Sequence, residues 1–316
     1  MPSQERRVLS FVAEYRTWLI AHNYTESTIR DYTLAIKRTL TTLMDAGMTY
    51  NPRKIGKEEV NFLLDVAWKD RATGTNKVEM AIFGKWLERM GSNPVVSNME
   101  IMWPSFVQKG TRPLPPNQCF SMMDQLDGAE RIVTHLMLYL GYRMIEVRRA
   151  QVSDIDWVNR RMLVHGKGHK GGKSRWVYFH HTTESELMSW LQQREELISA
   201  YRQDCLKKGL QPQDVPSNLL IYYSKAHGIG AYKHTAMENL VKRIFARTGL
   251  EGSAHSLRKS FARNLYLSGV KIEVISSLLG HTDPRTTIKY LGIEQDDQAD
   301  AQDMLSQFEK KYKVEK

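Results

Sequence analysis

Residues 278–290 read Leu-Leu-Gly-His-Thr-Asp-Pro-Arg-Thr-Thr-Ile-Lys-Tyr and carry the most informative pattern of this 316-residue chain. The stretch places His281 and Tyr290 nine residues apart across a predicted turn. Taken alone, a tyrosine in such a place is most often a packing residue on a helix. The stretch becomes decisive for fold and function only through its order and combination with two earlier segments.

The two earlier segments each place an arginine close to a second polar side chain. Residues 141–146 read Gly-Tyr-Arg-Met-Ile-Glu and follow an apolar run predicted to be helical. An arginine and a glutamate three residues apart on a helix usually form a surface ion pair worth about 0.3–0.5 kcal/mol. Residues 255–258 read His-Ser-Leu-Arg at a predicted helix start. A guanidinium and a helix N-terminus suit an anionic phosphate, although an isolated pair of this kind is more often solvated.

In combination, these segments resemble the catalytic domain of the tyrosine recombinases (integrases). The family pattern runs GxRxxE, a lysine in a β-hairpin, HxLR and LGHxxxxTTxxY, and this chain supplies all of these elements in that order. Residues 23–32, Asn-Tyr-Thr-Glu-Ser-Thr-Ile-Arg-Asp-Tyr, are similar to the first segment of the family's core-binding domain. The resemblance implies a site-specific recombinase that cleaves and rejoins duplex DNA through a 3′-phosphotyrosyl intermediate, without metal, ATP or another cofactor.

The resemblance also implies roles for the residues that would handle the scissile phosphate. Tyr290 would be the nucleophile, and Arg143 and Arg258 would clamp the non-bridging oxygens, where negative charge grows in the transition state. A free tyrosine has a pKa of about 10 and is a weak nucleophile at neutral pH. We expect the surrounding cationic residues to favour the phenolate.

Supporting roles are implied for two histidines and a glutamate. His255 would act as acid, base or donor near the tyrosine, and His281 would donate a hydrogen bond to the phosphate. Glu146 would orient the cationic cluster. The chain departs from the usual pattern at Ile145 and Lys259, and neither departure removes a catalytic group.

A lysine on the hairpin is implied as the general acid that protonates the leaving 5′-oxygen. Lys167 in Gly-Lys-Gly matches the family position best. The hairpin here is longer than usual, because residues 169–174 intervene before Arg175. Lys170 or Lys173 therefore stays open as the alternative general acid.

The expected fold is mainly α with a small β-hairpin or sheet (α+β): an N-terminal helical core-binding domain and a tyrosine-recombinase catalytic domain. Helical periodicity predicts helices before residue 92, including one capped by Thr25 and one near residues 57–69. Strands are predicted at residues 161–166 and 174–179, and mostly helix from there to Tyr290. The predicted organisation is a helical core-binding (SAM-like) domain at 1–92, a linker at 93–117, the catalytic domain at 118–293 and a C-terminal helix or tail at 294–316.

The charge balance favours a nucleic-acid partner, since 45 Lys and Arg outnumber 35 Asp and Glu for a net charge of +10. We expect double-stranded DNA as the partner, bound mostly through phosphate contacts. Candidate DNA contacts, each a better fit for a backbone contact or a solvated charge than for a base reader, are Arg30, Lys37, Arg38, Lys233, Lys242 and Arg243.

Cellular setting and assembly follow from weaker signals. Two cysteines are too few for a disulfide framework or a zinc site, which predicts a reducing compartment and no metal site. No apolar run is long enough to span a bilayer, so we expect a cytoplasmic, nucleoid-associated protein with no targeting segment and no membrane contact. Family resemblance implies a tetramer on two DNA sites. An apolar stripe in the tail could dock there on a neighbouring copy or pack on its own domain: Ala301, Met304, Leu305, Phe308 and Tyr312.

Three other functions fit parts of the pattern. A type IB topoisomerase shares the tyrosine chemistry, but the short core-binding domain and the LGHxxxxTT match disfavour it. A catalytically silent DNA-binding or architectural protein on the same fold is disfavoured by the complete set of matching residues. An unrelated helical nucleic-acid enzyme would need the motifs to occur by chance. Integration, excision, dimer resolution and inversion all stay open, and the lack of an arm-type domain before residue 5 favours a simple recombinase on short core sites.

Overall fold

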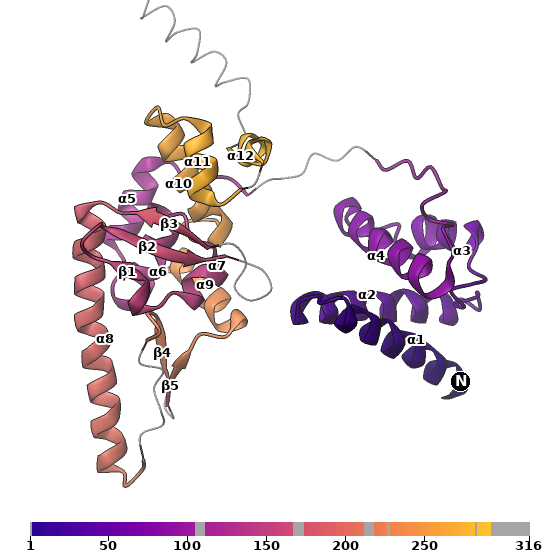
Figure 1. The fold of residues 1–316 in the computed structure, drawn as a ribbon, viewed down its shortest axis with the longest axis horizontal. Coiled ribbons are helices and arrows are strands. Elements are labelled where there is room, and N and C mark those ends of the chain that lie inside the picture. The colour runs from indigo at the N-terminus through magenta and orange to yellow at the C-terminus, as the bar shows by residue number, and fades with distance from the viewer. Residues whose placement is uncertain are drawn as a thin grey trace, which may run out of the picture. The chain divides into compact units, whose positions relative to one another are not determined.

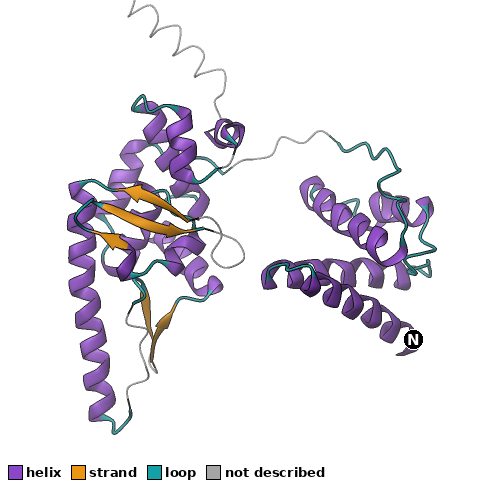
Figure 2. Cartoon of the chain, viewed as in Figure 1, coloured by secondary structure: helices purple, strands orange, loops and turns teal. Residues whose placement is uncertain are grey.

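The computed structural model describes residues 2–104, 111–166, 174–211, 218–225, 228–281 and 283–291. The chain divides into two compact units, Met1–Lys109 and Gly110–Lys316 (Figure 1). Helices dominate both units, and the strands lie in the second (Figure 2). The mainly α fold with a small sheet is as predicted. Among the described residues, no helix combines the length and apolar character needed to cross a bilayer.

The first unit is all-helical. Its elements are α1 (Pro2–Ala21), α2 (Glu26–Asp45), α3 (Lys57–Phe62), the π-helix η1 (Leu63–Ala67) and α4 (Thr73–Gly91). The predicted cap of α2 is confirmed, because the Thr25 hydroxyl accepts a hydrogen bond from the Thr28 amide at 3.3 Å. Large apolar side chains, including Tyr15, Ile36 and Trp86, are completely buried between the helices.

The predicted helix near residues 57–69 is interrupted by a π-helical turn. The Trp68 amide donates to the Leu63 carbonyl at 2.9 Å, five residues back instead of four. Trp68 is buried, and its carbonyl accepts from the Asn76 side chain at 2.9 Å. A spacing pattern of apolar residues does not reveal one extra residue in a single turn, which is why periodicity predicted a plain helix.

The second unit packs helices around a small antiparallel sheet. Its helices are α5 (Pro116–Asp124), α6 (Gly128–Tyr139), α7 (Met144–Arg149), the 3₁₀ turn η2 (Val152–Asp154), α8 (His181–Lys207), α9 (His234–Thr248), α10 (Ala254–Leu267), α11 (Ile272–Leu279) and α12 (Pro284–Leu291). Its strands are β1 (Ile155–Asp156), β2 (Arg161–His165), β3 (Ser174–Tyr178), β4 (Tyr222–Lys225) and β5 (Gly228–Ala231). The long helix α8 runs beside the sheet and extends well beyond it (Figure 1).

The three-stranded sheet has the order β1-β2-β3, and Leu163 pairs with Trp176 at the centre of β2 and β3. Alternate residues such as Met162 and Val177 point into the core, while Trp176 is exposed. The two predicted strands therefore form as expected. The prediction of mostly helix after residue 179 is wrong at β4 and β5, because strands of four residues are too short for periodicity to reveal.

The segment at residues 93–117 contributes to both cores. Its described part contains no helix or strand before α5 begins at Pro116. Val95, Val96 and Met99 pack against the core of the first unit. Leu114 is buried in the core of the second. The proline-rich segment that was predicted to be a linker thus packs side chains into the first unit near its start and into the second unit near its end.

Candidate active site

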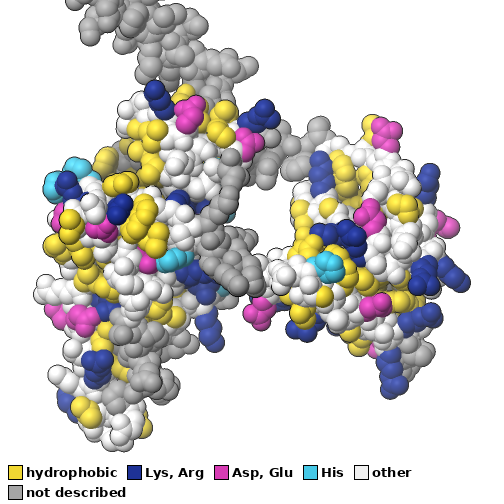
Figure 3. Space-filling view, in the orientation of Figure 1, with side chains coloured by type: hydrophobic (Ala, Val, Ile, Leu, Met, Phe, Trp, Pro, Cys, Tyr) yellow, Lys and Arg dark blue, Asp and Glu magenta, His cyan; other side chains and the backbone are white. Residues whose placement is uncertain are grey.

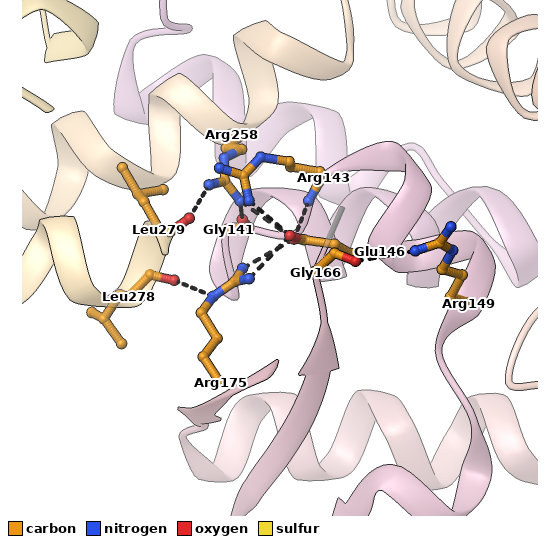
Figure 4. Close-up of polar contacts among 9 residues, drawn as sticks. All are labelled: Gly141, Arg143, Glu146, Arg149, Gly166, Arg175, Arg258, Leu278 and Leu279. Atoms are coloured by element: carbon orange, nitrogen blue, oxygen red, sulfur yellow. Dashed lines mark hydrogen bonds and ion pairs between the residues drawn. The ribbon is translucent and has the colours of Figure 1, made fainter. Parts of the chain in front are cut away.

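Glu146 is the centre of a buried cluster of arginines in the second unit (Figure 4). Its Oε1 atom accepts from Arg143 Nη1 at 2.8 Å and Arg175 Nη1 at 3.0 Å. Its Oε2 atom accepts from Arg175 Nη2 at 3.0 Å and lies 3.5 Å from Arg258 Nη1. Burial opposes ionisation of Glu146, but the arginines outweigh it and hold the pKa of the carboxyl below its usual value. One carboxylate therefore holds three guanidinium groups.

Arg143 stands at the N-cap of α7. Its amide donates to Glu146 Oε2 at 2.8 Å, so the glutamate also closes the first turn of the helix. The pair is not the exposed surface ion pair that the i, i+3 spacing suggested, because the Glu146 side chain has no exposed surface. Arg143 keeps 29% of its side chain exposed and is the most accessible arginine of the three.

Arg258 is almost completely enclosed in α10, with 2% of its side chain exposed. Its guanidinium donates to the carbonyl oxygens of Gly141 and Leu279. Glycine is required at position 141, because its φ of +64° favours glycine and a Cβ there would clash with the ring of Phe261, which also lies on α10. Burial and the neighbouring charge of Arg143 lower the pKa of Arg258 to about 10. The side chain is fixed before any ligand arrives.

Arg175 on β3 belongs to this cluster, although sequence reasoning gave it no role. Its Nε donates to the Leu278 carbonyl at 2.8 Å, in addition to its two bonds to Glu146. The only signal in the sequence was its place directly after the lysine-rich hairpin. That place gave no indication that the side chain reaches α7 and α11.

His281 follows the C-terminus of α11 and is fixed on both sides. Its amide donates to the Ser276 carbonyl at 3.0 Å, and its Nδ1 atom shares a hydrogen bond of 2.9 Å with the buried Thr287 hydroxyl. Burial and the charges of Arg258, Arg143 and Arg175 lower the pKa of His281 to about 4. The ring is therefore neutral at pH 7 in the DNA-free chain.

Tyr290 on α12 lies beside His281, with ring centroids 5.5 Å apart at an interplanar angle of 81°. Lys259 Nζ lies 5.3 Å from the centre of the tyrosine ring. The Tyr290 hydroxyl is buried, and no described residue makes a well-formed hydrogen bond to it. Burial raises the pKa of Tyr290 to about 12, although the charges of Arg258 and Arg143 act in the opposite direction. The arginines thus favour the phenolate as expected, but in the DNA-free chain desolvation outweighs them.

His255 lies in the first turn of α10, one turn before Arg258, and its side chain is exposed. Burial of part of the ring and the nearby charges of Arg258, Arg143 and Lys259 lower the pKa of His255. The structure thus brings Arg143, Arg258, His281 and Tyr290 together around Glu146. Lys167, Lys170 and Lys173 lie outside the described residues, as do the tail residues Ala301, Met304, Leu305, Phe308 and Tyr312.

The candidate DNA contacts lie on helices α2 and α9, except Lys233, which directly precedes α9. Arg30, Lys37 and Arg38 are exposed on α2, where Arg30 pairs with Asp31 and Arg38 lies 3.5 Å from Glu79. Lys233, Lys242 and Arg243 are exposed on the second unit, and Arg243 lies 3.6 Å from Glu130. Basic, acidic and hydrophobic side chains are interspersed on the visible face of each unit (Figure 3).

Cofactor ligands are not evident in the part of the chain that the structure describes. No cluster of three or more His, Cys, Asp or Glu side chains there could hold a metal ion. Cys119 and Cys205 are both buried and unpaired. The polar groups that converge at the site are guanidinium, imidazole and phenol, a set suited to an anion.

Comparison with known sequences matches residues 113–296 to the phage integrase family. Tyrosine recombinase XerC from Lactobacillus delbrueckii subsp. bulgaricus is 31% identical over 162 residues, which are 51% of this chain and 49% of that protein. Tyrosine recombinase XerA from Thermococcus onnurineus is 28% identical over 161 residues, 51% of this chain and 50% of that protein. The chain thus spans about half the length of the sequence relatives that it matches.

Solved structures share the fold. XerH recombinase bound to palindromic difH substrate, in a post-cleavage complex, matches with a TM-score of 0.66 at 18% identity, over 90% of this chain and 82% of that one. A lambda integrase dimer (residues 75–356) bound to a COC′ core site matches with a TM-score of 0.64 at 16% identity, over 89% and 94%. The family match covers more than half of this chain, which shows that the chain belongs to the phage integrase family of tyrosine recombinases.

Proposed function

We propose that this chain is a site-specific recombinase that cleaves and rejoins duplex DNA through a 3′-phosphotyrosyl intermediate. The observation that carries the proposal is the position of the Tyr290 phenol within the field of Arg258 and Arg143, whose own positions are fixed by Glu146. XerC and XerA, which match about half of this chain, are tyrosine recombinases. The reaction would serve integration, excision, dimer resolution or inversion of DNA.

The proposed chemistry is two successive transesterifications. The Tyr290 oxygen attacks the scissile phosphorus, the bond to the 5′-oxygen breaks, and the tyrosine proton leaves to a base. Arg143 and Arg258 bind the non-bridging oxygens and stabilise the charge of the five-coordinate transition state. A 5′-hydroxyl then attacks the phosphotyrosine and releases Tyr290. The phosphodiester energy is kept throughout, so the reaction needs no ATP. Arg143 and Arg258 supply the positive charge that a metal ion would otherwise provide.

The remaining residues have proton and hydrogen-bonding roles in this proposal. Exposed His255 serves as acid, base or donor near the tyrosine, and neutral His281 can donate one hydrogen bond to the phosphate. Lys167 protonates the leaving 5′-oxygen, with Lys170 and Lys173 as alternatives. The pKa of Tyr290 near 12 in the DNA-free chain means that the nucleophile is protonated until substrate binds.

Duplex DNA is the proposed partner, and a tetramer on two DNA sites is the proposed assembly. XerH and lambda integrase are each bound to DNA in the solved complexes. Exposed cations on α2 and α9 fit contacts to backbone phosphates. The apolar stripe of the tail is proposed to dock on a neighbouring copy. A cytoplasmic, nucleoid-associated protein would meet this DNA directly.

The proposal is tested by trapping the covalent intermediate. The wild-type chain and Tyr290→Phe are incubated, without added metal or ATP, with nicked duplexes taken from the DNA that flanks its own gene. Denaturing gels then reveal any protein–DNA adduct. We expect an adduct with wild type only, because phenylalanine keeps the ring packing but lacks the attacking oxygen.

The other outcomes separate the competing functions. Equal adduct from both proteins would reject Tyr290 as nucleophile. Tight, salt-sensitive binding without an adduct on any duplex would favour an architectural protein. If the adduct forms, joining of strands from two labelled duplexes supports a recombinase, whereas relaxation of supercoiled plasmid without strand exchange supports a type IB topoisomerase.

A further inference from the structure

We infer that Arg175 is a positioning residue of the DNA-cleaving site, which fixes the arginine pair and the His281 turn in one geometry. The inference rests on the proposed function and adds a residue that the motif pattern does not contain. Arg175 contacts neither Tyr290 nor His281 directly among its recorded bonds. It acts through Glu146 and through the backbone of α11.

In the first contact, Arg175 binds Glu146 through two hydrogen bonds. Arg175 Nη1 and Nη2 each lie 3.0 Å from a different oxygen of Glu146, which is the bidentate geometry that a planar guanidinium provides. The same two oxygens accept from Arg143 and approach Arg258. A carboxylate held from behind in this way cannot rotate without breaking two bonds. The orientation of Glu146, and with it that of Arg143 and Arg258, therefore depends on Arg175.

The second contact anchors the end of α11. The last carbonyl oxygens of a helix lack partners within the helix and carry its negative dipole end. Here the Ser276 and Ser277 carbonyls accept from the Gly280 amide, Leu278 accepts from Arg175, and Leu279 accepts from Arg258. Two guanidinium groups thus complete the helix end that leads directly into His281.

The close approach of Arg175 to this turn has a steric signature at Gly280. Gly280 has φ +65°, and a Cβ placed there would meet Arg175 Cδ at 3.2 Å and Nη1 at 3.3 Å. Gly249 is a matched case, because it also ends a helix with φ +65° but has nothing within 4 Å of an added Cβ. The two glycines therefore differ in their contact with Arg175 and share the same backbone conformation.

The test compares Arg175→Lys with Arg161→Lys in the full chain, on the duplex that gives the wild-type adduct. Lysine keeps the charge but cannot make the fork to Glu146 and the bond to Leu278 together. Arg161 is a sound control, since it lies on neighbouring β2 and pairs with Asp156 at 2.8 Å, away from Glu146. We expect the single-turnover rate of adduct formation to fall about 10–100-fold for Arg175→Lys. The duplex Kd and the Arg161→Lys rate should stay within about threefold of wild type.

A second substrate separates the arginine clamp from the general acid. A duplex with sulfur in place of the bridging 5′-oxygen at the scissile phosphate has a leaving group that needs no proton. If Arg175 acts through the arginines, its defect persists on this duplex. If the defect disappears, Arg175 serves protonation of the leaving group instead, and the inference is overturned.

Failure of the inference and failure of the proposed function look different. No wild-type adduct means that the proposed function fails, whereas equal rates for wild type and Arg175→Lys overturn only the role of Arg175. Thermal unfolding is measured on each variant. If Arg175→Lys does not fold, Gly280→Ala and Gly249→Ala replace it, and the inference requires slower adduct formation for Gly280→Ala alone. Equal rates for the two glycine variants would overturn it.

Discussion

Each unit of the chain contains one buried glutamate bound by arginines, and the two sites are built differently. In the first unit, Glu79 on α4 accepts from Arg71 and the Thr39 hydroxyl and lies 3.5 Å from Arg38. Arg38 and Arg71 keep 58% and 32% of their side chains exposed. In the second unit, the arginines around Glu146 are at most 29% exposed. The first carboxylate thus holds one exposed and one partly exposed arginine, whereas the second holds three arginines, two of which are almost enclosed.

The difference shows that exposed arginines suit DNA binding, whereas buried arginines suit catalysis. Exposed guanidinium groups attract DNA phosphates at any register, and salt weakens that attraction. Buried guanidinium groups need no reorganisation when charge develops at a transferring phosphate, so they stabilise a transition state more than a ground state. Arg258 and Arg175 are held by main-chain carbonyls in addition to Glu146. In the described part of the chain, the guanidinium groups of Arg38 and Arg71 contact Glu79 without a main-chain carbonyl partner, and that of Arg71 also lies over the Trp68 ring.

The largest expected contrast is in stability. Glu146→Gln leaves three buried or half-buried arginines without a countercharge and should lower the opening free energy of the second unit by about 3–5 kcal/mol. Glu79→Gln has partners that can turn to water and should cost the first unit about 1–2 kcal/mol. Hydrogen exchange measured peptide by peptide reports each unit separately in the intact chain. Equal losses in both units would mean that the burial difference has no energetic weight.

Sequence reasoning identified residues that the structure brings together in the second site, but not the framework that holds them. Arg143, Arg258, His281 and Tyr290 were identifiable because the motif places them in fixed order, and the structure brings them together. Arg175 and the Glu79 site were missed. Each of these depends on contacts between segments far apart in the chain, and a guanidinium that bonds a distant carbonyl leaves no periodic trace.

The net pKa of Tyr290 was not predictable for a related reason. Neighbouring cations lower it as expected, but the depth of burial decides the outcome, and burial is a property of the assembled core. The small sheet was predictable at β2 and β3, where two runs flank a glycine-rich loop. The hairpin of β4 and β5 was too short to predict, and the π-turn at η1 has no spacing signal of its own.

Stability at acid pH should depend on His281, which lies in the positive field of the arginines around Glu146. An unfolded histidine has a pKa of about 6.5, whereas that of His281 is about 4. Between these values the unfolded chain binds a proton that the folded chain does not. The unfolding free energy should therefore fall as the pH drops from 6.5 to 4, and His281 should account for no more than about 3 kcal/mol of that fall. Above pH 6.5 the contribution of neutral His281 to stability is fully present.

Denaturant unfolding at several pH values tests this in wild type and in Arg143→Gln. Arg143 contributes to lowering the His281 pKa, so its removal should raise that pKa and flatten the pH dependence. His135, whose pKa burial also lowers to about 4, gives the same background in both proteins, whereas the His255 pKa also changes with Arg143 and is followed separately by NMR. An NMR titration of the His281 ring gives the pKa directly. An unchanged pKa in Arg143→Gln would show that Arg143 does not help to keep His281 neutral.

The smallest expected effect is in the first unit, where each exposed cation should contribute to DNA affinity by neutralising about one phosphate. Lys37→Gln and Arg38→Gln should each weaken duplex binding only a few-fold and make the slope of log K against log salt shallower by about one. Lys208→Gln removes the same charge from an exposed site at the end of α8 and should leave the slope unchanged. If all three variants behave alike, net charge and not position governs binding. In that case Glu79 would stabilise its own helices without presenting Arg38 to DNA, and the contrast between the two glutamates would be one of burial only.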